Sequence, residues 1–213
     1  HWMVHSFPTR RSSDLAWGPV AREPLSRVRE VTAETLAHAW ATIPQVTQHD
    51  KADVTELEAF RRAYAERNPE ARLTMTAILV KVVAAALRAF PRFNAALDLP
   101  RRELVLRQYV HVGVAVDTEH GLLVPVIRDA DGKGILRIAA ELADLAARAR
   151  ARKVLPAELE GGGFTTSNLG GIGGTGFSPI VYPPQVAILG VSRAVTEPVW
   201  RDGQFAPRLL LPL

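Results

Sequence analysis

Apolar residues at helical spacing predict an amphipathic helix near the beginning of the chain. Pro44 should end this helix, because a proline inside a helix removes a hydrogen bond and clashes with the preceding turn. The apolar positions fall roughly on one helical face, which makes the helix amphipathic. They are Val28, Val31, Leu36 and Trp40.

Three further segments have the pattern of helices. Asp53 followed by Glu56 resembles an N-cap with an acid at the third helical position, which predicts a helix over residues 54–66. Residues 74–90 are apolar nearly all round, so we expect this helix to be central. Residues 135–153 predict a helix packed on a sheet, because one face carries Ile135, Ile138, Leu142 and Leu145.

Alternating, valine-rich patterns predict the strands. One strand should lead into the helix at residues 54–66, and residues 103–134 should form two or three strands of one sheet. The pair Asp202-Gly203 predicts a hairpin turn between the last two strands. The order of helices and strands implies an α/β fold of the two-layer α+β kind, with helices packed on a mixed sheet.

Composition supports one compact domain and limits its chemistry. The 213 residues are 47% hydrophobic and 23% charged, which is enough to bury a large core. The chain contains no cysteine, so any thiol chemistry must come from a substrate, and a reducing, cytoplasmic setting is expected. The longest apolar region is interrupted by Lys81 and Arg88, so we expect no membrane span.

The basic residues and histidines give no sign of a nucleic acid or metal partner. The formal net charge is +4, but the basic residues are scattered along the sequence rather than grouped with aromatics. The densest run, residues 148–153, falls where a helix should end, and cations there favour the helix dipole; phosphate binding is the alternative. His38, His49, His111 and His120 do not stand in the H-x-x-x-H or H-E-x-x-H spacing of metal-binding histidines.

Residues 161–194 combine a high density of glycines with the segment T-T-S-N at residues 165–168. Ser167 does not stand in G-x-S-x-G, so the nucleophile elbow of the hydrolases is absent. The glycines do not form a phosphate-binding loop either. Two interpretations stay open from these residues alone. Ser167 could donate a hydrogen bond to a developing oxyanion, or the segment could be a plain glycine-rich turn.

Residues 22–213 resemble the catalytic core of the dihydrolipoamide acyltransferases, the E2 components of 2-oxoacid dehydrogenase complexes. The similarity covers successive signature segments in order and with similar spacing. The last segment of the chain, "EPVWRDGQFAPRLLLPL", is more like the acetyl-transferring, pyruvate-type members. The segments that carry the resemblance are "REPLSRVREVTAETLAHAWATIPQVTQHDKADVTELEAFR", "FPRFNAALD", "VGVAVDTEHGLLVPVIRDADGKGI", "GGFTTSNLGGIGGTGFSPIV" and "PPQVAILGVSRA".

This resemblance implies a chloramphenicol-acetyltransferase-like fold, a homotrimer and a larger E2 core assembly. It places the active site in a channel at the subunit interface, which coenzyme A and the lipoyl arm enter from opposite sides. The implied reaction transfers an acyl group between the dihydrolipoyl and coenzyme A thiols, without a metal. The implied partners are the lipoyl domain, which carries the lipoyl group, and the E1 and E3 components.

The resemblance also assigns individual residues. Ser167 matches the family's oxyanion donor, and Arg61 suits a phosphate of coenzyme A because a guanidinium binds phosphate oxygens in a fork. The alternative for Arg61 is a solvated arginine on a helix face. The residues that match coenzyme A contacts of the family are Arg61, Thr74, Asp117, Asn168 and Gly190.

The chain departs from the family at both ends. The family's general base is a histidine in D-H-R-x-x-D-G, and none of the six histidines stands in that motif. We therefore expect residues 22–213 to be a catalytic domain truncated before the motif, and inactive alone. Residues 1–21 are expected to be a non-native or disordered tail, since "HWMVHSFPTRRSSDL" resembles translated adapter sequence. The alternatives are a non-catalytic E2-like scaffold and a stand-alone acetyltransferase of the chloramphenicol-acetyltransferase type.

Overall fold

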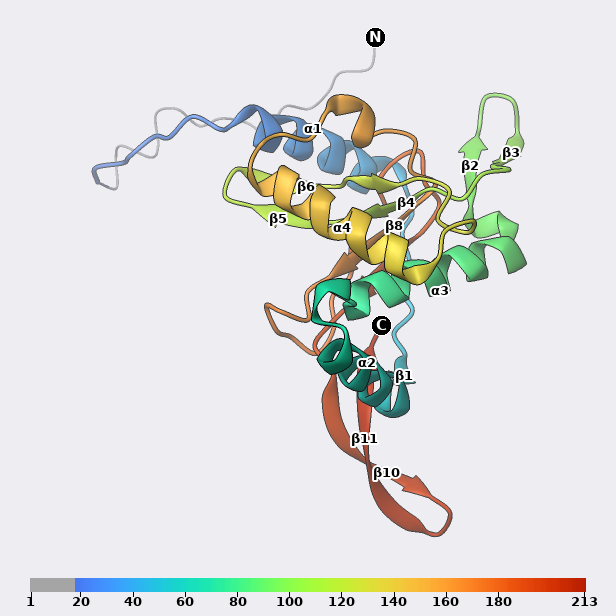
Figure 1. The fold of residues 1–213 in the computed structure, drawn as a ribbon. Coiled ribbons are helices and arrows are strands. Elements are labelled where there is room, and N and C mark those ends of the chain that lie inside the picture. The colour runs from blue at the N-terminus through green and yellow to red at the C-terminus, as the bar shows by residue number, and fades with distance from the viewer. Residues whose placement is uncertain (1–17) are drawn as a thin grey trace.

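A computed structural model describes residues 18–213, which form helices packed against several small β-sheets (Figure 1). The non-native tail expected at residues 1–21 lies, up to residue 17, outside the described residues. The four helices predicted from the sequence are all present in the structure. They are α1 (Arg27–Thr42), α2 (Thr55–Arg67), α3 (Met75–Ala89) and α4 (Ile135–Arg150), with short 3₁₀ turns at η2 (Pro69–Ala71), η3 (Pro91–Phe93) and η4 (Pro156–Glu158).

The strands of the described chain form four sheets, in the orders β7-β4-β8-β9, β1-β11-β10, β2-β3 and β5-β6. In the first of these, β8 runs parallel to both β4 and β9, while β7 is antiparallel to β4. The strands are β1 (Lys51–Asp53), β2 (Ala95–Asp98), β3 (Glu103–Leu106), β4 (Val112–Val114), β5 (Val116–Thr118), β6 (Gly121–Leu123), β7 (Val126–Ile127), β8 (Phe164–Asn168), β9 (Ile188–Val191), β10 (Val195–Arg201) and β11 (Gln204–Pro212).

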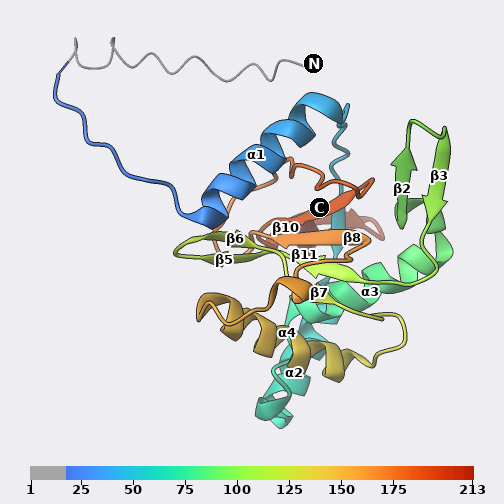
Figure 2. The ribbon, with the colours of Figure 1, turned by 90° about the horizontal axis from the view of Figure 1, so that it is seen from above.

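The main core lies where α3 and α4 pack on the four-stranded sheet. Side chains of both helices cluster with those of β4, β7 and β8, and include the fully buried Val80, Val112 and Ile138. Helix α1 lies on the other side of the sheets from α3 and α4 (Figure 2). The predicted α/β fold with helices packed on a mixed sheet is therefore confirmed.

Strands β10 and β11 form an arm that projects from the body of the molecule (Figure 1). Strand β1 pairs only with the end of β11, so the rest of the hairpin is a two-stranded ribbon. Near its tip Trp200 and Phe205 pack edge to face, with ring centroids 5.0 Å apart. The turn between them has Asp202 and Gly203 at positive φ of 51° and 81°, so the predicted hairpin turn is confirmed.

The predicted N-cap of α2 is wrong by one residue. Val54 occupies the cap position and makes no side-chain cap hydrogen bond. Asp53 ends β1 instead, and its Oδ1 accepts hydrogen bonds from the backbone N and the hydroxyl of Thr55, at 3.1 and 2.6 Å. Its other carboxylate oxygen forms an ion pair with Arg208 at 2.6 Å. Asp53 therefore connects the beginning of α2 with β11, through Thr55 and Arg208, and is not the N-cap residue of α2.

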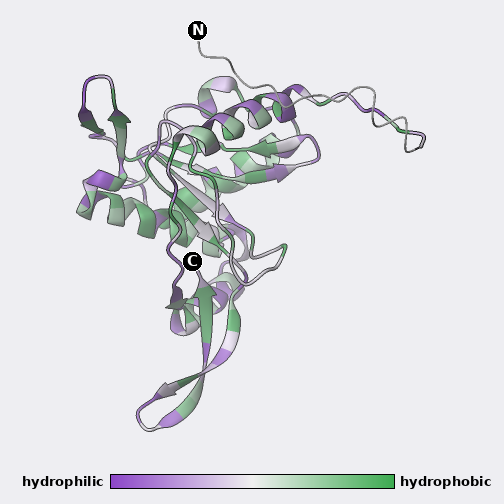
Figure 3. Ribbon diagram, turned by 180° about the vertical axis from the view of Figure 1, so that it is seen from behind, coloured by the Kyte–Doolittle hydropathy of each residue, from purple (hydrophilic) through white to green (hydrophobic). Residues whose placement is uncertain are grey.

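The apolar face of α1 is only partly covered. Trp40 is 69% exposed, whereas Val28 and Leu36 are half-buried and Ala39 is the helix's buried residue. In Figure 3, which colours the ribbon by hydropathy, α1 carries both hydrophilic (purple) and hydrophobic (green) residues. Residues 103–134 form five short strands in three sheets instead of two or three strands in one. Alternation identifies strands, but it does not specify which strands pair with each other.

Candidate functional site

Ser167 lies near the end of β8, in the interior of the four-stranded sheet. Successive side chains of a strand point to opposite faces, so Ser167 shares a face with Thr165, and Thr166 shares the other with Asn168. Thr165 donates to Gln185 Oε1 at 2.8 Å and Thr166 donates to the carbonyl of Gly113 at 3.3 Å. Within residues 18–213 the structure gives the Ser167 hydroxyl no hydrogen bond, and the side chain is only partly buried. Of the three hydroxyls, Ser167 has the one that is available to a ligand.

Gly190 of β9 stands beside Ser167 in the parallel register. A Cβ at this position would lie 3.0 Å from Phe177 Cζ and 3.1 Å from Pro179 Cγ, so a larger residue would force these side chains to shift. Gly190 also lines a cavity of about 520 Å³ between residues 43–50 and 177–181. Ser167 and Gly190 share a face of the sheet, and Gly190 but not Ser167 lines this cavity.

Asn168 lies on the opposite face and is held at both ends of its amide. Its Nδ2 donates to Thr76 Oγ1 at 3.0 Å, and its Oδ1 accepts from the backbone N of Gly170 at 2.8 Å. Thr74 precedes Thr76 as the N-cap of α3, where its hydroxyl accepts from Ala77 N at 3.2 Å. These contacts place the end of β8 next to the beginning of α3.

Arg61 of α2 is engaged by neighbouring groups. Its Nε and one terminal nitrogen donate to the two carboxylate oxygens of Glu58, at 2.7 and 2.8 Å, and its other terminal nitrogen donates to the carbonyl of Leu73 at 3.1 Å. The hydrogen bonds from Arg61, supported by Arg62, lower the pKa of the Glu58 carboxyl from its usual 4.5 to about 2. Both edges of the guanidinium are thus occupied. The phosphate contact expected of Arg61 stays a prediction.

The predicted coenzyme A residues fall into three places. Arg61, Thr74 and Asn168 line one cavity of about 410 Å³. Thr74 and Asn168 also line a second cavity of about 590 Å³, together with Asp117 of β5. Gly190 lines a separate cavity of about 520 Å³. Thr74, Asn168 and Asp117 therefore lie around one cavity in the structure. Arg61 lies at the other cavity that Thr74 and Asn168 line, and Gly190 lines neither of the two.

Three polar side chains in the second cavity were not predicted as site residues from the sequence. Arg72, Thr76 and Arg150 line it beside Thr74 and Asn168. Arg150 belongs to the basic run at the end of α4, for which phosphate binding was the alternative to a role at the helix dipole. The basic run at residues 148–153 was the only feature of the sequence that pointed to Arg150. Helical spacing does not show which cavity an arginine at the end of a helix lines.

Two of the four histidines in residues 18–213, His111 and His120, have side-chain contacts within the protein. His111 Nδ1 accepts from the backbone N of Asp129 at 3.0 Å, and His120 contacts Arg152. The described residues contain no group of three or more His, Cys, Asp or Glu side chains that could hold a metal ion. Within residues 18–213, every helix is too short or too polar to cross a membrane.

Comparison with known proteins gives consistent matches over this whole region. Residues 18–213 match the family model described as 2-oxoacid dehydrogenases acyltransferase (catalytic domain). The acetyltransferase component of the pyruvate dehydrogenase complex of Cupriavidus necator is 48% identical over 199 residues, 92% of this chain and 36% of the relative. The chain thus spans about a third of the length of this curated relative.

Solved structures agree with the sequence comparison. A structure of dihydrolipoamide acetyltransferase from Azotobacter vinelandii, from an investigation of a serine, a histidine and an asparagine in its catalytic mechanism, superposes with a TM-score of 0.91. It is 46% identical and covers 94% of this chain and 83% of the other. The cubic core of a pyruvate dehydrogenase multienzyme complex has the same TM-score, identity and coverage. The chain belongs to the family of 2-oxoacid dehydrogenase acyltransferase catalytic domains.

Proposed function

We propose that residues 22–213 are the catalytic domain of a dihydrolipoamide acyltransferase that carries an acetyl group between dihydrolipoyl and coenzyme A thiols. The observation that carries this proposal is the free hydroxyl of Ser167, held on β8 while the hydroxyls of Thr165 and Thr166 are engaged. The similarity to acetyltransferase components of pyruvate dehydrogenase complexes supports acetyl as the acyl group.

The reaction exchanges one thioester for another. The sulfur of one thiol attacks the thioester carbonyl, a new carbon–sulfur bond forms, and the carbonyl oxygen becomes an oxyanion. In this proposal the Ser167 hydroxyl donates to that oxyanion, and the old carbon–sulfur bond then breaks. The departing sulfur takes a proton and becomes a free thiol. The reaction therefore starts and ends with one thiol and one thioester.

The attacking thiol must lose its proton, because a free thiol has a pKa of about 8.5 and is mostly protonated at neutral pH. The general base of this reaction is assigned to the histidine of a D-H-R-x-x-D-G segment, which the sequence of residues 1–213 does not contain. His111 is a poor substitute, since its Nδ1 already accepts from the backbone of Asp129. We therefore expect residues 1–213 alone to be inactive.

The partners follow from the same proposal. A homotrimer and a larger core assembly are proposed on the likeness to the cubic core of a pyruvate dehydrogenase complex. The lipoyl domain, E1 and E3 are proposed as partners, and coenzyme A and the lipoyl group as the two thiol carriers. The cytoplasmic location expected from the sequence stays a prediction.

A chimaera tests this function. The chain would be extended by the segment of the Azotobacter vinelandii relative that contains D-H-R-x-x-D-G, and S-acetyl-dihydrolipoamide would be measured with acetyl-CoA as donor. We expect turnover from the chimaera and none from residues 1–213. A folded, trimeric chimaera without turnover would favour the scaffold alternative. Acetylation of a small hydroxylated acceptor in place of dihydrolipoamide would favour the stand-alone acetyltransferase.

A further inference from the structure

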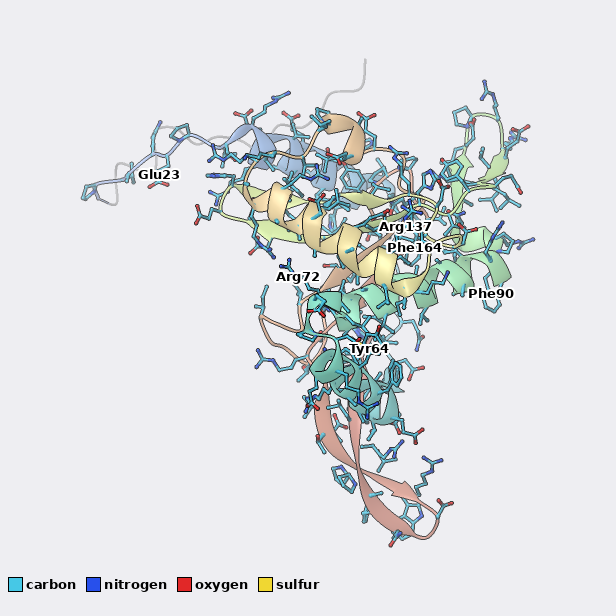
Figure 4. All side chains as sticks on the ribbon, in the orientation of Figure 1. Glu23, Tyr64, Arg72, Phe90, Arg137 and Phe164 are labelled. Atoms are coloured by element: carbon cyan, nitrogen blue, oxygen red, sulfur yellow. The ribbon has the colours of Figure 1, made fainter. Side chains whose placement is uncertain are left out.

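The two faces of β8 have different surroundings. Phe164, the first residue of the strand, packs in the main core with side chains of α3 and α4 (Figure 4). Asn168 is on the same face and donates to Thr76 at the beginning of α3. Because side chains alternate along a strand, Thr165 and Ser167 point away from these two helices. The hydroxyl of Ser167 therefore depends on other parts of the chain for its position.

The segment between β8 and β9 covers the face on which Ser167 lies. Gly190 is the register partner of Ser167, and a Cβ on Gly190 would lie 3.0 Å from Phe177 of this segment. Further along the same segment, Gln185 contacts Thr165. The contacts that hold this segment against β8 therefore also determine what surrounds the serine.

Gln185 joins this segment to β8 through both ends of its amide. Its Oε1 accepts from the Thr165 hydroxyl at 2.8 Å, and its Nε2 donates to the carbonyl of Gly162 at 3.2 Å. The backbone N of Gln185 donates to the carbonyl of Tyr182 at 3.0 Å. Gln185 is 8% exposed and Thr165 is 2% exposed. One buried side chain thus fixes two points of the chain, the residue before the entry to β8 and a residue inside the strand.

Loss of this amide should move the strand. The Thr165 hydroxyl and the Gly162 carbonyl would be left without their partner, and a buried polar group without a partner costs free energy. The chain would relieve this cost by a shift of β8, and Thr165 is only two residues before Ser167 on the same face. Functional groups must be held within about 0.5 Å of their productive position. A small shift is therefore enough to weaken a hydrogen bond from Ser167 to an oxyanion.

We propose that Gln185 is a positioning residue for Ser167. Through Thr165 and Gly162 it holds β8 where the Ser167 hydroxyl meets the oxyanion of the acetyl transfer. This inference rests on the proposed function, and Gln185 acts on the reaction only through the serine. Its contribution to the rate should therefore exist only while residue 167 carries a hydroxyl. A residue that merely stabilises the fold would contribute equally with and without that hydroxyl.

A double-mutant cycle between residues 185 and 167 tests the proposal in the chimaera that carries the D-H-R-x-x-D-G segment. Gln185→Met keeps the length of the side chain and loses both hydrogen bonds. It should lower kcat for S-acetyl-dihydrolipoamide formation about tenfold and change the KM values little, because the misplaced donor acts in the transition state. In the Ser167→Ala background the same change should have no further effect on kcat. Gln204→Met, at an exposed site at the beginning of β11, is the matched control and should keep the kcat of the parent chimaera.

Variants of Thr165 test the route of this effect. Thr165→Val keeps the shape of the side chain and loses the hydroxyl that Gln185 accepts from, so its kcat should also fall. Thr165→Ser keeps the hydroxyl and should retain kcat. In urea unfolding of the same chimaera, Gln185→Met/Thr165→Val should unfold at no lower urea concentration than Gln185→Met alone, because the second change removes a partner that is already lost. Additive shifts of the two changes would contradict the contact on which the inference depends.

The outcomes separate this inference from the proposed function. Unchanged kcat in Gln185→Met, or an equal loss with and without the Ser167 hydroxyl, would overturn the inference and leave the proposed function intact. A folded, trimeric parent chimaera without turnover would overturn both. If Gln185→Met does not fold, Thr165→Val, which removes only one of the two hydrogen bonds, takes its place in the cycle with the same expected and opposing results.

Discussion

Ser167 of β8 and Gly190 of β9 are register partners in the parallel part of the central sheet. Because register partners share a face, the hydroxyl of Ser167 lies beside a position without a side chain. A Cβ added at that position would lie 3.0 Å from Phe177 and 3.1 Å from Pro179, closer than ordinary van der Waals contact. The space in front of the serine therefore depends on a glycine in the neighbouring strand and on the segment that covers it.

Gly190→Ala should destabilise the protein. The added Cβ would meet Phe177 at 3.0 Å and Pro179 at 3.1 Å, and rings held this closely must shift to make room. Overpacking of this kind costs about 1–3 kcal/mol, which urea unfolding followed by circular dichroism can measure. Gly171→Ala is the control, since its Cβ would meet nothing within 4 Å. Equal stability of the two variants would contradict the packing described here.

Ser167→Ala should slow acetyl transfer without preventing it. In the chimaera with the D-H-R-x-x-D-G segment, loss of one oxyanion donor should lower kcat by about 10²- to 10³-fold. The KM values for both thiols should change little, because the hydrogen bond is made mainly in the transition state. Thr165→Ser, which keeps the hydroxyl that donates to Gln185, is the matched control and should retain activity. Full activity of Ser167→Ala would remove Ser167 from the mechanism.

The helices and the last hairpin could be predicted from the sequence because their signals are local. Thr74 caps α3 and Asp202-Gly203 turns the hairpin through contacts within a few residues. The division of residues 103–134 among three sheets could not be predicted in this way, because strand pairing joins residues far apart, as between β4 and β8. The exposed Trp40 likewise shows that apolar residues at helical spacing are not all buried in the fold.

The candidate site shows the same limit. The glycine-rich segment and the family resemblance identify Ser167, but periodicity alone left an ordinary turn equally open. The partners of Arg61 could not be predicted in full: Glu58 is three residues away on the same helix, whereas Leu73 approaches only through the tertiary fold. Arg72 was not identified, because a left-handed backbone at a non-glycine residue leaves no signature in the sequence.

The stability of the protein should depend on pH through Glu58. Hydrogen bonds from Arg61 hold the folded pKa of this carboxyl at about 2, below its usual 4.5. A lowered folded pKa means that the stabilisation is present above about pH 4.5 and is lost as the pH falls towards 2.

Glu58→Gln should therefore unfold at lower urea concentration than the parent chain at pH 7, and the two should converge near pH 2. The side chain of Glu58 is 14% exposed, so the difference at pH 7 should be about 1–3 kcal/mol. Glu66→Gln, at an exposed site on the same helix, is the control and should follow the parent at every pH. A difference between Glu58→Gln and the parent that is independent of pH would contradict the assignment to this carboxyl.

Gly163, at the entry to β8, should tolerate no side chain. A Cβ there would overlap Asn94 Oδ1, and Asn94 is 2% exposed and fixed by hydrogen bonds to the carbonyls of Arg107 and Tyr109. Gly163→Ala should cost about 3 kcal/mol, whereas Gly132→Ala, with its Cβ in ordinary contact with Asp129, should cost much less.

A double-mutant cycle between Gly163 and Asn94 distinguishes overlap from a general effect on the strand. Asn94→Ala removes the atom that the new Cβ would meet, so the double variant Gly163→Ala/Asn94→Ala should be more stable than the sum of the single effects predicts. The expected coupling is about 1 kcal/mol or more in urea unfolding. Because Gly163 donates its backbone N–H to the carbonyl of His111 at 2.9 Å, its displacement would also shift the strand that carries Ser167. Strictly additive effects would mean that the two residues do not constrain each other, and that Asn94 has no part in holding β8 in place.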